Sequence, residues 1–362
     1  MSTSLGAPLT FRRGPDWSNR MMLAPLTNWQ SHDDGVLSEE EFTWLSMRAK
    51  GGFGLVMTCA TAVAPTAHAF EGQLAAHADR HDAGMARLAG VITQGGAVSS
   101  MQLHHGGLRA QTHLAPEVVA PSASPEHSAR GVTTEEVEAL RDAYVNAALR
   151  AERAGFDGVE VHGAHGYLLA QFLSEQYNRR DDRYGGSAEN RARLLIEVVE
   201  GIRAACRPDF QLGLRLSAER YGLKLAESVE LAGRIMDAGD IDYLDMSLWD
   251  VTKEPEEDAH QGQTLLSHFT GLPRNGVRLG AAGKIYTAAD ARWVLEAGCD
   301  FAIIGRGAIL HHDFAARALA DPDYRTPPTP VTPDYLRAEG LSPTFIKHMR
   351  KYAGFVADEE DA

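Results

Sequence analysis

Two histidines and a tyrosine stand close together where a short apolar run ends. The run, GVEVHGAH, covers residues 158–165 and supplies His162 and His165, and Tyr167 follows two residues later. Imidazoles bind metals or donate hydrogen bonds, and a tyrosine hydroxyl can donate a proton. The pattern therefore indicates either a metal centre or a site that holds a polar atom of a substrate.

Polar side chains also follow other apolar runs. Arg215 lies between Leu214 and Leu216, where a buried charge costs several kcal/mol unless it is paired. This arginine could hold a ligand or form a structural salt bridge inside the fold. The other residues of this kind are Thr27, Trp29, Cys59, Thr61, Gln102, His104, His105, Ser247 and Trp249.

Two further runs end in glycine and a cation. The segment AAGKIYTAAD supplies Gly283 and Lys284, and IIGRGA supplies Gly305 and Arg306. Glycine lets the backbone approach a ligand closely, and the N–H groups at the start of a helix bind anions. Because the two motifs follow consecutive predicted strands, they predict one pocket for a phosphorylated ligand.

A zinc-dependent hydrolase with His162 and His165 as metal ligands is the alternative. Zinc needs several His, Cys or carboxylate ligands that converge. No Asp or Glu ends the runs that carry the histidines and Arg215, and a metal cation would share the site with that arginine. An organic cofactor with a phosphate tail is therefore favoured, with Gln102 and Arg215 at its polar edge. The hydrolase stays open as the second hypothesis.

Eight short apolar runs would position these side chains. Continuous apolar runs bounded by glycine and polar residues are typical of strands covered on both faces. Eight strands that alternate with helices predict a (β/α)8 TIM barrel, whose active site is built by the loops after the strands. An open doubly wound sheet is the runner-up, but its GxGxxG motif is missing after the first strand. The predicted strands are 20–26, 54–60, 99–105, 158–165, 211–218, 242–248, 277–283 and 301–307.

Helical patterns fill the segments between these strands. In residues 133–154, Thr133 and Glu136 have the spacing of a capping box, and Gly155 is a suitable stop. The other predicted helices are 37–50, 79–95, 188–206, 225–238, 287–297 and 307–320. The connection 249–276 has no clear pattern.

The composition limits the partners. The chain has 362 residues and a formal net charge of −14, which argues against nucleic acid or an anionic membrane. Cys59, Cys206 and Cys299 lack metal-ligand spacing and suit buried thiols in a reducing compartment. The sequence has neither a membrane-length apolar run nor the apolar core of a signal peptide. We expect a cytoplasmic protein that acts on a small molecule.

Several segments match one known family. The most specific is GFDGVEVHGAHGYLLAQFLSEQYNRRDDRYGGSAENRARLL at 155–195. The others are NRMMLAPLTN (19–28), RAKGGFGLVMTCATAV (48–63), QLHHGG (102–107), LRLSA (214–218), GKI (283–285) and IIGRG (303–307). On these segments, over roughly residues 8–325, the chain resembles the Old Yellow Enzyme family of FMN-dependent ene-reductases.

The resemblance implies a barrel that binds FMN noncovalently and takes hydride from NADH or NADPH. The residues that would contact FMN are Ala24, Pro25, Leu26, Thr27, Ala60, Gln102, Arg215, Gly283, Lys284, Gly305 and Arg306. Those that would contact the substrate are His162, His165, Trp29 and Trp249. In the catalytic set, the two histidines would bind the electron-withdrawing oxygen, and Tyr167 matches the family's proton donor. The implied reaction is ping-pong reduction of the C=C bond of electrophilic alkenes, such as α,β-unsaturated carbonyls and nitroalkenes.

Some features depart from parts of the family. Thr27 stands where some bacterial relatives have Cys, and HGAH matches the His–His variant rather than the His–Asn one. The cysteine cluster of larger iron–sulfur relatives is missing. The physiological alkene and the choice between NADH and NADPH do not follow from the sequence. A homo-oligomer is compatible with the sequence, which does not fix the number of subunits.

The chain divides into an expected barrel, residues 1–325, and an extension, residues 326–362. The extension is expected to hold one helix at 342–353, with Ser342 as its cap and Pro343 in its first turn. This helix could pack on its own barrel or on a neighbouring subunit. The acidic end, ADEEDA at 357–362, is expected to be disordered and dispensable.

Overall fold

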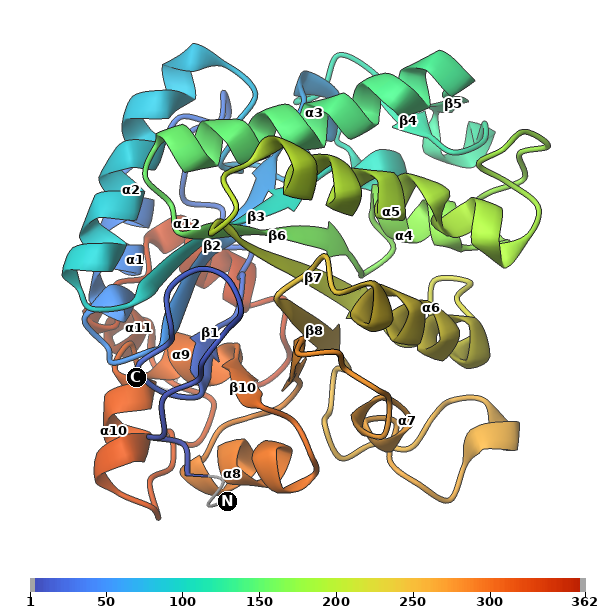
Figure 1. Cartoon of the computed structure of the whole chain (residues 1–362). Coiled ribbons are helices and arrows are strands. Elements are labelled where there is room, and N and C mark those ends of the chain that lie inside the picture. Colours follow the sequence, from blue (N-terminus) through green and yellow to red (C-terminus); the bar gives the residue numbers. More distant parts are fainter. Residues whose placement is uncertain (1–3, 359–362) are drawn as a thin grey trace.

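The centre of the molecule is a closed barrel of eight parallel strands. The structure is a computed structural model that describes residues 4–358. Around the barrel the strands follow the order β1-β10-β9-β8-β7-β6-β3-β2, so the predicted (β/α)8 barrel is confirmed (Figure 1). The strands are β1 (Met21–Leu23), β2 (Leu55–Ala62), β3 (Val98–His104), β6 (Gly158–Gly163), β7 (Gln211–Ser217), β8 (Tyr243–Ser247), β9 (Arg278–Ala282) and β10 (Phe301–Ile304).

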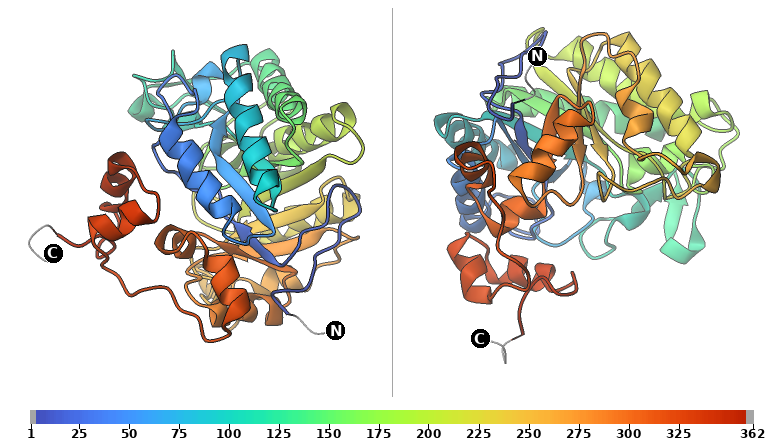
Figure 2. Two further views of the ribbon diagram at one scale, coloured as in Figure 1. Left: turned by 90° about the vertical axis from the view of Figure 1, so that its left-hand side faces the viewer. Right: turned by 90° about the horizontal axis from the view of Figure 1, so that it is seen from below.

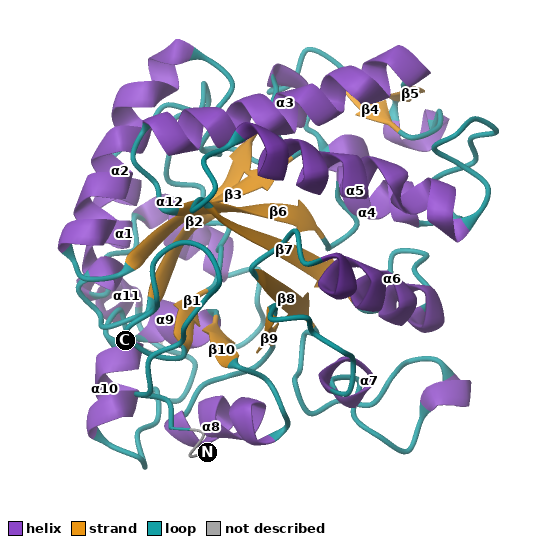
Figure 3. Cartoon of the chain, in the orientation of Figure 1, coloured by secondary structure: helices purple, strands orange, loops and turns teal. Residues whose placement is uncertain are grey.

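Helices surround the strands on the outside (Figure 3). The capping box predicted for Thr133 and Glu136 starts α3, and the face with Val137, Leu140 and Tyr144 is buried against the barrel core. The α-helices are α1 (Glu39–Ala49), α2 (Asp82–Gln94), α3 (Thr134–Arg153), α4 (Leu168–Leu173), α5 (Ala188–Ala205), α6 (Leu225–Ala238), α7 (Ser267–Thr270), α8 (Ala288–Glu296), α9 (Arg306–Leu310), α10 (Phe314–Ala320), α11 (Pro333–Ala338) and α12 (Pro343–Met349). Short 3₁₀ turns cover Pro65–Ala67, Asp79–His81, Gly107–Arg109, Pro125–His127 and Asp258–His260.

Two boundaries near the end of the barrel differ from the prediction. Strand β10 ends at Ile304, because the predicted strand residues 305–307 already lead into α9. The single helix predicted at 307–320 is broken between α9 and α10. There Glu339 Oε2 accepts a hydrogen bond from the backbone N–H of His312 at 2.7 Å. The same oxygen lies 2.7 Å from the ring Nδ1 of His312. A distant segment thus takes the donor that a continuous helix would use.

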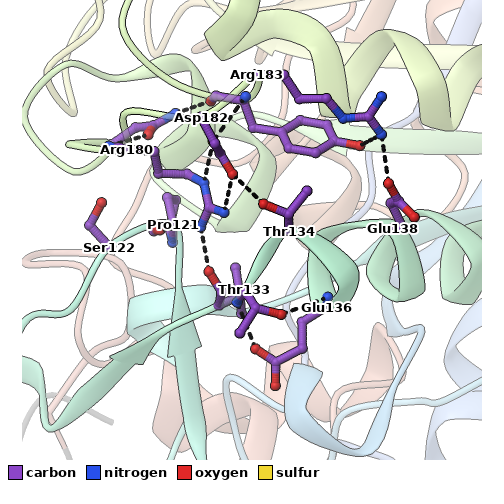
Figure 4. Close-up of polar contacts among 12 residues, drawn as sticks. Pro121, Ser122, Thr133, Thr134, Glu136, Glu138, Arg180, Asp182 and Arg183 are labelled. Carbon is purple, nitrogen blue, oxygen red and sulfur yellow. Dashed lines mark hydrogen bonds and ion pairs between the residues drawn. The ribbon is translucent and has the colours of Figure 1, made fainter.

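The connection from β3 to α3 carries a small second sheet of β4 (Val118–Ala120) and β5 (Ala129–Gly131). The loop 177–186, part of the most specific family-like block, packs beside it. Figure 4 shows how Arg180 joins the two: it donates to the Pro121 carbonyl at 2.8 Å and pairs with Asp182. Asp182 also accepts from the Thr134 hydroxyl at 2.7 Å. Arg180 and Asp182 of that block therefore hold the loop against the second sheet and the start of α3.

The C-terminal segment packs on its own barrel. Phe345 of α12 meets the Trp44 ring of α1 edge-on, with 5.6 Å between centroids. Arg48 donates to the Glu339 carbonyl at 2.7 Å, and the Ser342 N–H donates to Gln30 Oε1 at 2.9 Å. Figure 2 shows the segment, in red, at the periphery of the barrel.

This segment corrects three details of the prediction. It contains two helices, α11 and α12, where one was expected. Helix α12 stops at Met349, so Tyr352 lies beyond it. Ala357, predicted to be disordered, is buried, and its N–H donates to the Val331 carbonyl at 2.9 Å. Residues 359–362, the rest of the acidic end except Asp358, lie outside the described part of the chain.

None of the helices within residues 4–358 combines the length and the apolar character that crossing a membrane requires.

Candidate active site

A cavity of about 890 Å³ lies at the carboxyl ends of the barrel strands. Because the strands are parallel, residues at their carboxyl ends reach the same mouth of the barrel. Every residue predicted for the site lines this cavity, although they come from positions 24 to 306. They are Ala24, Pro25, Leu26, Thr27, Trp29, Ala60, Gln102, His162, His165, Tyr167, Arg215, Trp249, Gly283, Lys284, Gly305 and Arg306.

His162 and His165 form a contacting pair. His162 is the fifth residue of β6, next to Arg215 of β7 in register, and His165 follows in the turn after the strand. His165 Nδ1 lies 3.3 Å from His162 Nε2, and His165 Nε2 lies 2.6 Å from Ser247 Oγ. The His165 N–H donates to Ser217 Oγ at 3.0 Å, which fixes its backbone at the end of β7.

Both histidines are neutral at pH 7. Burial lowers the pKa of His162 well below its usual range, and the neighbouring His165 and His104 lower it further. Burial, then Arg215 and Arg109, lower the pKa of His165 in the same way. A neutral imidazole carries one N–H, so both rings can donate to one ligand atom only if that atom replaces the contact between Nδ1 of His165 and Nε2 of His162.

Tyr167 lies beside this pair. It precedes α4, and its backbone carbonyl accepts from the Gln171 N–H at 2.8 Å. Its ring stands edge-on to His104, with 4.3 Å between centroids, and lies 5.4 Å from the His162 ring. Burial raises the pKa of the Tyr167 hydroxyl, an effect that Arg109 opposes, so the hydroxyl keeps its proton at neutral pH.

His104 and His105, which also end a strand, have local structural partners and do not line the cavity. His104 Nδ1 lies 3.0 Å from Gln73 Nε2 and packs against Tyr167. His105 Nδ1 accepts from the Gly107 N–H at 3.1 Å, and its Nε2 contacts Thr66 Oγ1 at 3.0 Å. These two histidines support the site rather than face it.

Arg215 is both an ion-pair partner and a cavity residue. Its Nε lies 3.0 Å from Asp245 Oδ2, and its Nη2 donates to Ser247 Oγ at 3.1 Å. Sequence reasoning found no carboxylate at the ends of the histidine-bearing strands. Glu160, two residues before His162 in β6, is a buried carboxyl that accepts from Gln102 Nε2 at 2.8 Å. Its alternation with His162 on the inner face of the strand could have identified it.

The other side of the cavity offers cations and close backbone. A Cβ on Gly283 would lie 2.7 Å from the Trp249 carbonyl carbon, so only glycine fits there. A Cβ on Gly305 would meet only Leu26, at 3.8 Å, which leaves the backbone open to a ligand. Lys284 pairs with Asp250 at 3.0 Å, and Arg306 lies over the Tyr286 ring at 5.7 Å. This end suits an anionic group.

The charge of the cavity opposes that of the whole protein. Seven basic residues line it, against a single acidic residue, Asp250. The basic residues are Arg109, Arg215, Arg220, Lys253, Lys284, Arg306 and Lys351. Four of these cations pair with carboxylates: Arg215 with Asp245, Arg220 with Glu256, Lys253 with Glu219 and Lys284 with Asp250. Within residues 4–358, Arg109, Arg306 and Lys351 are the cavity cations that remain to attract an anionic ligand.

Backbone strain gathers at the same place. Eight non-glycine residues among 4–358 have positive φ, and six of them line the cavity. The six are Trp29, His165, Arg220, Tyr221, Trp249 and Lys284. Such conformations cost about 1–3 kcal/mol each and persist where the surrounding fold holds them. Their clustering marks this mouth as the functional face.

The C-terminal segment adds cavity residues that the sequence did not predict. Lys351 Nζ lies 3.9 Å from the centre of the Trp29 ring, and His348 packs on the same ring at 4.7 Å. Tyr352 lies under Arg306, with 5.8 Å from guanidinium carbon to ring centre. Arg109, Tyr221 and Tyr286 were also missed. The basic and aromatic stretch HMRKY was the only signal for the C-terminal members.

No group of three or more His, Cys, Asp or Glu side chains within residues 4–358 is arranged to hold a metal ion. The metal-dependent hydrolase hypothesis therefore gains no ligand set from this part of the chain.

Comparisons with known proteins agree with this geometry. Residues 4–321 match the family model described as "NADH:flavin oxidoreductase / NADH oxidase family". The probable NADH-dependent flavin oxidoreductase YqiG of Bacillus subtilis (strain 168) is 37% identical over 322 residues, 86% of each chain. An NADPH dehydrogenase of Bacillus pumilus (strain SAFR-032) is 34% identical over 84% of this chain and 91% of its own. The solved structure of an old yellow enzyme homologue from Zymomonas mobilis has a TM-score of 0.77 at 26% identity, covering 89% of this chain and 94% of its own.

Proposed function

Because the chain belongs to the NADH:flavin oxidoreductase / NADH oxidase family and is an Old Yellow Enzyme family protein, we propose that it is an ene-reductase. It uses FMN and NAD(P)H, and its substrates are small alkenes activated by a carbonyl or nitro group. The observation that carries the proposal is that His162, His165 and Tyr167 share one cavity with Gln102, Arg215 and the basic end at Arg306.

The residues present fit FMN. Between the polar groups Gln102 and Arg215 and the cations Lys284 and Arg306, the cavity wall is formed by the small or apolar residues at 24–26 and Ala60. A flat ring system suits this wall, and a single phosphate suits the cations with the open Gly305 backbone. When bound, FMN carries hydride from the nicotinamide to the β-carbon of the alkene.

In this proposal the histidine pair binds the activating oxygen. Each neutral imidazole can donate one hydrogen bond, and both reach the oxygen once it replaces the contact between Nδ1 of His165 and Nε2 of His162. Negative charge develops on that oxygen during hydride addition, and fixed donors stabilise it more than water does. Ser247 supports the arrangement, since it contacts His165 and accepts from Arg215.

Tyr167 donates the proton to the α-carbon. Its hydroxyl is protonated at neutral pH, and its ring is held by His104 and by Arg109, whose guanidinium carbon lies 5.3 Å from the ring centre. A positioned acid of this kind typically contributes about 10²–10⁴-fold to the rate.

A single cavity serves both substrates, which favours a ping-pong mechanism. The barrel within residues 1–325 supplies the catalytic side chains, while the extension from residue 326 contributes His348, Lys351 and Tyr352 to one wall. Because both substrates would use the same cavity, the nicotinamide would leave before the alkene binds.

The experiment is to purify the chain, release its cofactor by heat and identify it, then mix the holoenzyme with NADH or NADPH without oxygen. We expect FMN, a yellow colour that bleaches, and recovery of the colour on adding 2-cyclohexenone, with the saturated ketone as product. Initial rates at several concentrations of both substrates should give parallel double-reciprocal lines. Bleaching without any recovery by enones or nitroalkenes would refute the ene-reductase.

A further inference from the structure

Four polar side chains meet inside the barrel on four adjacent strands. Gln102 of β3 is in register with Glu160 of β6, and Arg215 of β7 is in register with Asp245 of β8. All four are buried, and both carboxyls are 0% exposed. Such a cluster is costly to bury, so each member needs a partner.

The contacts run in two pairs. Glu160 Oε1 accepts from Gln102 Nε2 at 2.8 Å. Asp245 Oδ2 lies 3.0 Å from Arg215 Nε, an ion pair whose alignment is not that of a hydrogen bond. In each pair a carboxyl that does not line the cavity contacts a side chain that does.

We propose that Asp245 and Glu160 are positioning residues for FMN: Asp245 orients the Arg215 guanidinium, and Glu160 orients the Gln102 amide, toward the polar edge of the ring. The inference rests on the proposed function, in which Gln102 and Arg215 meet that edge. Neither carboxyl touches the ring or the substrate. Both act through the side chain that each one holds.

The two carboxyls hold different charges. Burial raises the pKa of Glu160, and the nearby Asp245 raises it further, while Arg215 opposes both effects. Burial also raises the pKa of Asp245, but its contact with Arg215 counteracts this. Asp245 therefore ionises first and balances Arg215, and Glu160 keeps its proton at neutral pH.

The polar and titratable groups around Glu160 come from three neighbouring strands. Asp245 and Tyr243 lie on β8, Arg215 lies on β7, and Gln102 lies on β3. Burial raises the pKa of the Tyr243 hydroxyl well above its usual range, so it stays neutral. Asp245 and Arg215 are thus the charges that control the protonation of Glu160.

The test compares Asp245→Asn and Glu160→Gln by FMN affinity and by the midpoint potential of the bound flavin. Asp245→Asn removes the carboxylate nearest to Arg215, so the negative charge gained on reduction is favoured. Because Asp245 no longer raises the pKa of Glu160, the change is also made together with Glu160→Gln, where no carboxyl can ionise in its place. We expect the equilibrium to shift about tenfold toward the reduced form, which is ~30 mV for a two-electron couple. Because Arg215 also loses its orientation, we expect FMN binding about tenfold weaker.

Glu160→Gln gives the contrasting result. At pH 7 the substitution replaces one neutral group by another, so the equilibrium constant for reduction of the bound flavin should change less than twofold. As the pH rises above the raised pKa of Glu160, the wild-type site gains negative charge and its potential falls. The Gln variant lacks this additional fall, and a profile parallel to wild type up to pH 9 would overturn the role of Glu160.

Asp242→Asn is the matched control. Asp242 is a buried carboxylate just before β8 that pairs with Arg13 and Arg203, each at 2.7 Å, outside the cavity. The Asp242→Asn variant should have a lower free energy of unfolding and an unchanged flavin potential. If Asp245→Asn loses FMN altogether while Asp242→Asn keeps it, the positioning role is supported; equal loss in both overturns it.

An unshifted potential with unchanged FMN affinity in Asp245→Asn also overturns the inference. Wild-type protein that binds no FMN would instead refute the proposed function and this inference together, so the two failures are distinguishable.

Discussion

The protonation states of Tyr167, His162 and His165 are set by the groups that surround them. Tyrosine is a weak acid in water, and burial weakens it further, so its hydroxyl carries a proton across the whole physiological range. The histidines are neutral for the same reason, burial. Burial therefore keeps the Tyr167 hydroxyl protonated and both imidazoles neutral, so each imidazole ring carries a single N–H.

We predict that Tyr167→Phe keeps flavin reduction by NAD(P)H nearly unchanged but slows single-turnover reduction of an enone by about 10²–10⁴-fold. Nitroalkenes should be affected less, because a stable nitronate can leave and take its proton from water. In the wild type, loss of the Tyr167 proton should not limit the enone rate up to pH 9, since this donor is lost only as the pH rises through the raised pKa of Tyr167. An equal enone rate in the variant would remove Tyr167 from the mechanism.

We predict that His162→Ala and His165→Ala keep FMN but lose binding of phenols and enones. Loss of one fixed donor typically costs about 2.7–4 kcal/mol of barrier, which is measured as the drop in the reoxidation rate by an enone. His105→Ala is the control, because His105 is buried at the end of neighbouring β3 but has only structural partners. If all three variants behave alike, the pair has only a packing role.

At the scale of elements, strand ends and the turns after them form the site. Parallel strands present His162, Arg215 and Ser247 on adjacent strands β6, β7 and β8. The turns then adopt left-handed backbone at residues such as His165, Trp249 and Lys284. Strained turns of this kind are stable only because the rigid barrel fixes both of their ends.

The C-terminal helix α12 gives a test at this scale. Phe345 is fully buried against Trp44, so Phe345→Ala should lower the free energy of unfolding by about 3–5 kcal/mol. Lys347→Ala, an exposed change in the same helix, should stay within about 0.5 kcal/mol. Both are measured by denaturant unfolding.

Repeating that measurement at several protein concentrations tests in solution the packing of α12 on its own barrel. Packing on the same barrel gives a stability independent of concentration, whereas packing on a neighbouring subunit makes it rise with concentration. Loss of Phe345 without any effect on stability would contradict both.

At the scale of the whole molecule, charge is distributed unevenly. The net charge of −14 coexists with a cavity in which basic residues outnumber acidic ones by seven to one. An anionic ligand such as FMN is thus drawn to one face of a protein that otherwise repels anions.

We predict that FMN at 100 times its dissociation constant stabilises the apoprotein by about 2.7 kcal/mol, measured as a rise in its melting temperature. Arg306→Ala removes a charged phosphate partner worth about 1.5–3 kcal/mol, so FMN affinity should fall about 10–100-fold. Arg317→Ala, which removes an exposed arginine of α10 paired with Asp313, should leave affinity unchanged. Equal FMN affinity in all three proteins would place the phosphate elsewhere.

The architecture and the residues at the barrel mouth could be predicted from the amino-acid sequence. Eight apolar runs separated by amphipathic helices leave few folds open, because strands covered on both faces need a helix on the outside. The residues at the ends of those runs were predictable for the same reason: parallel strands must bring their carboxyl ends together. Local chemistry, such as the capping box at Thr133, was readable as well.

The pairing of distant groups could not be predicted from the sequence, because it depends on how the strands and helices pack. Glu160 and Asp245 are single acidic residues within apolar runs, and no local pattern identifies their contacts. Their contacts with Gln102 and Arg215 depend on strand register across the closed barrel. The break between α9 and α10 depends on Glu339. The C-terminal wall of the cavity depends on α12 packing against α1. Such contacts join residues far apart in the chain, and their energies depend on burial that no local pattern encodes.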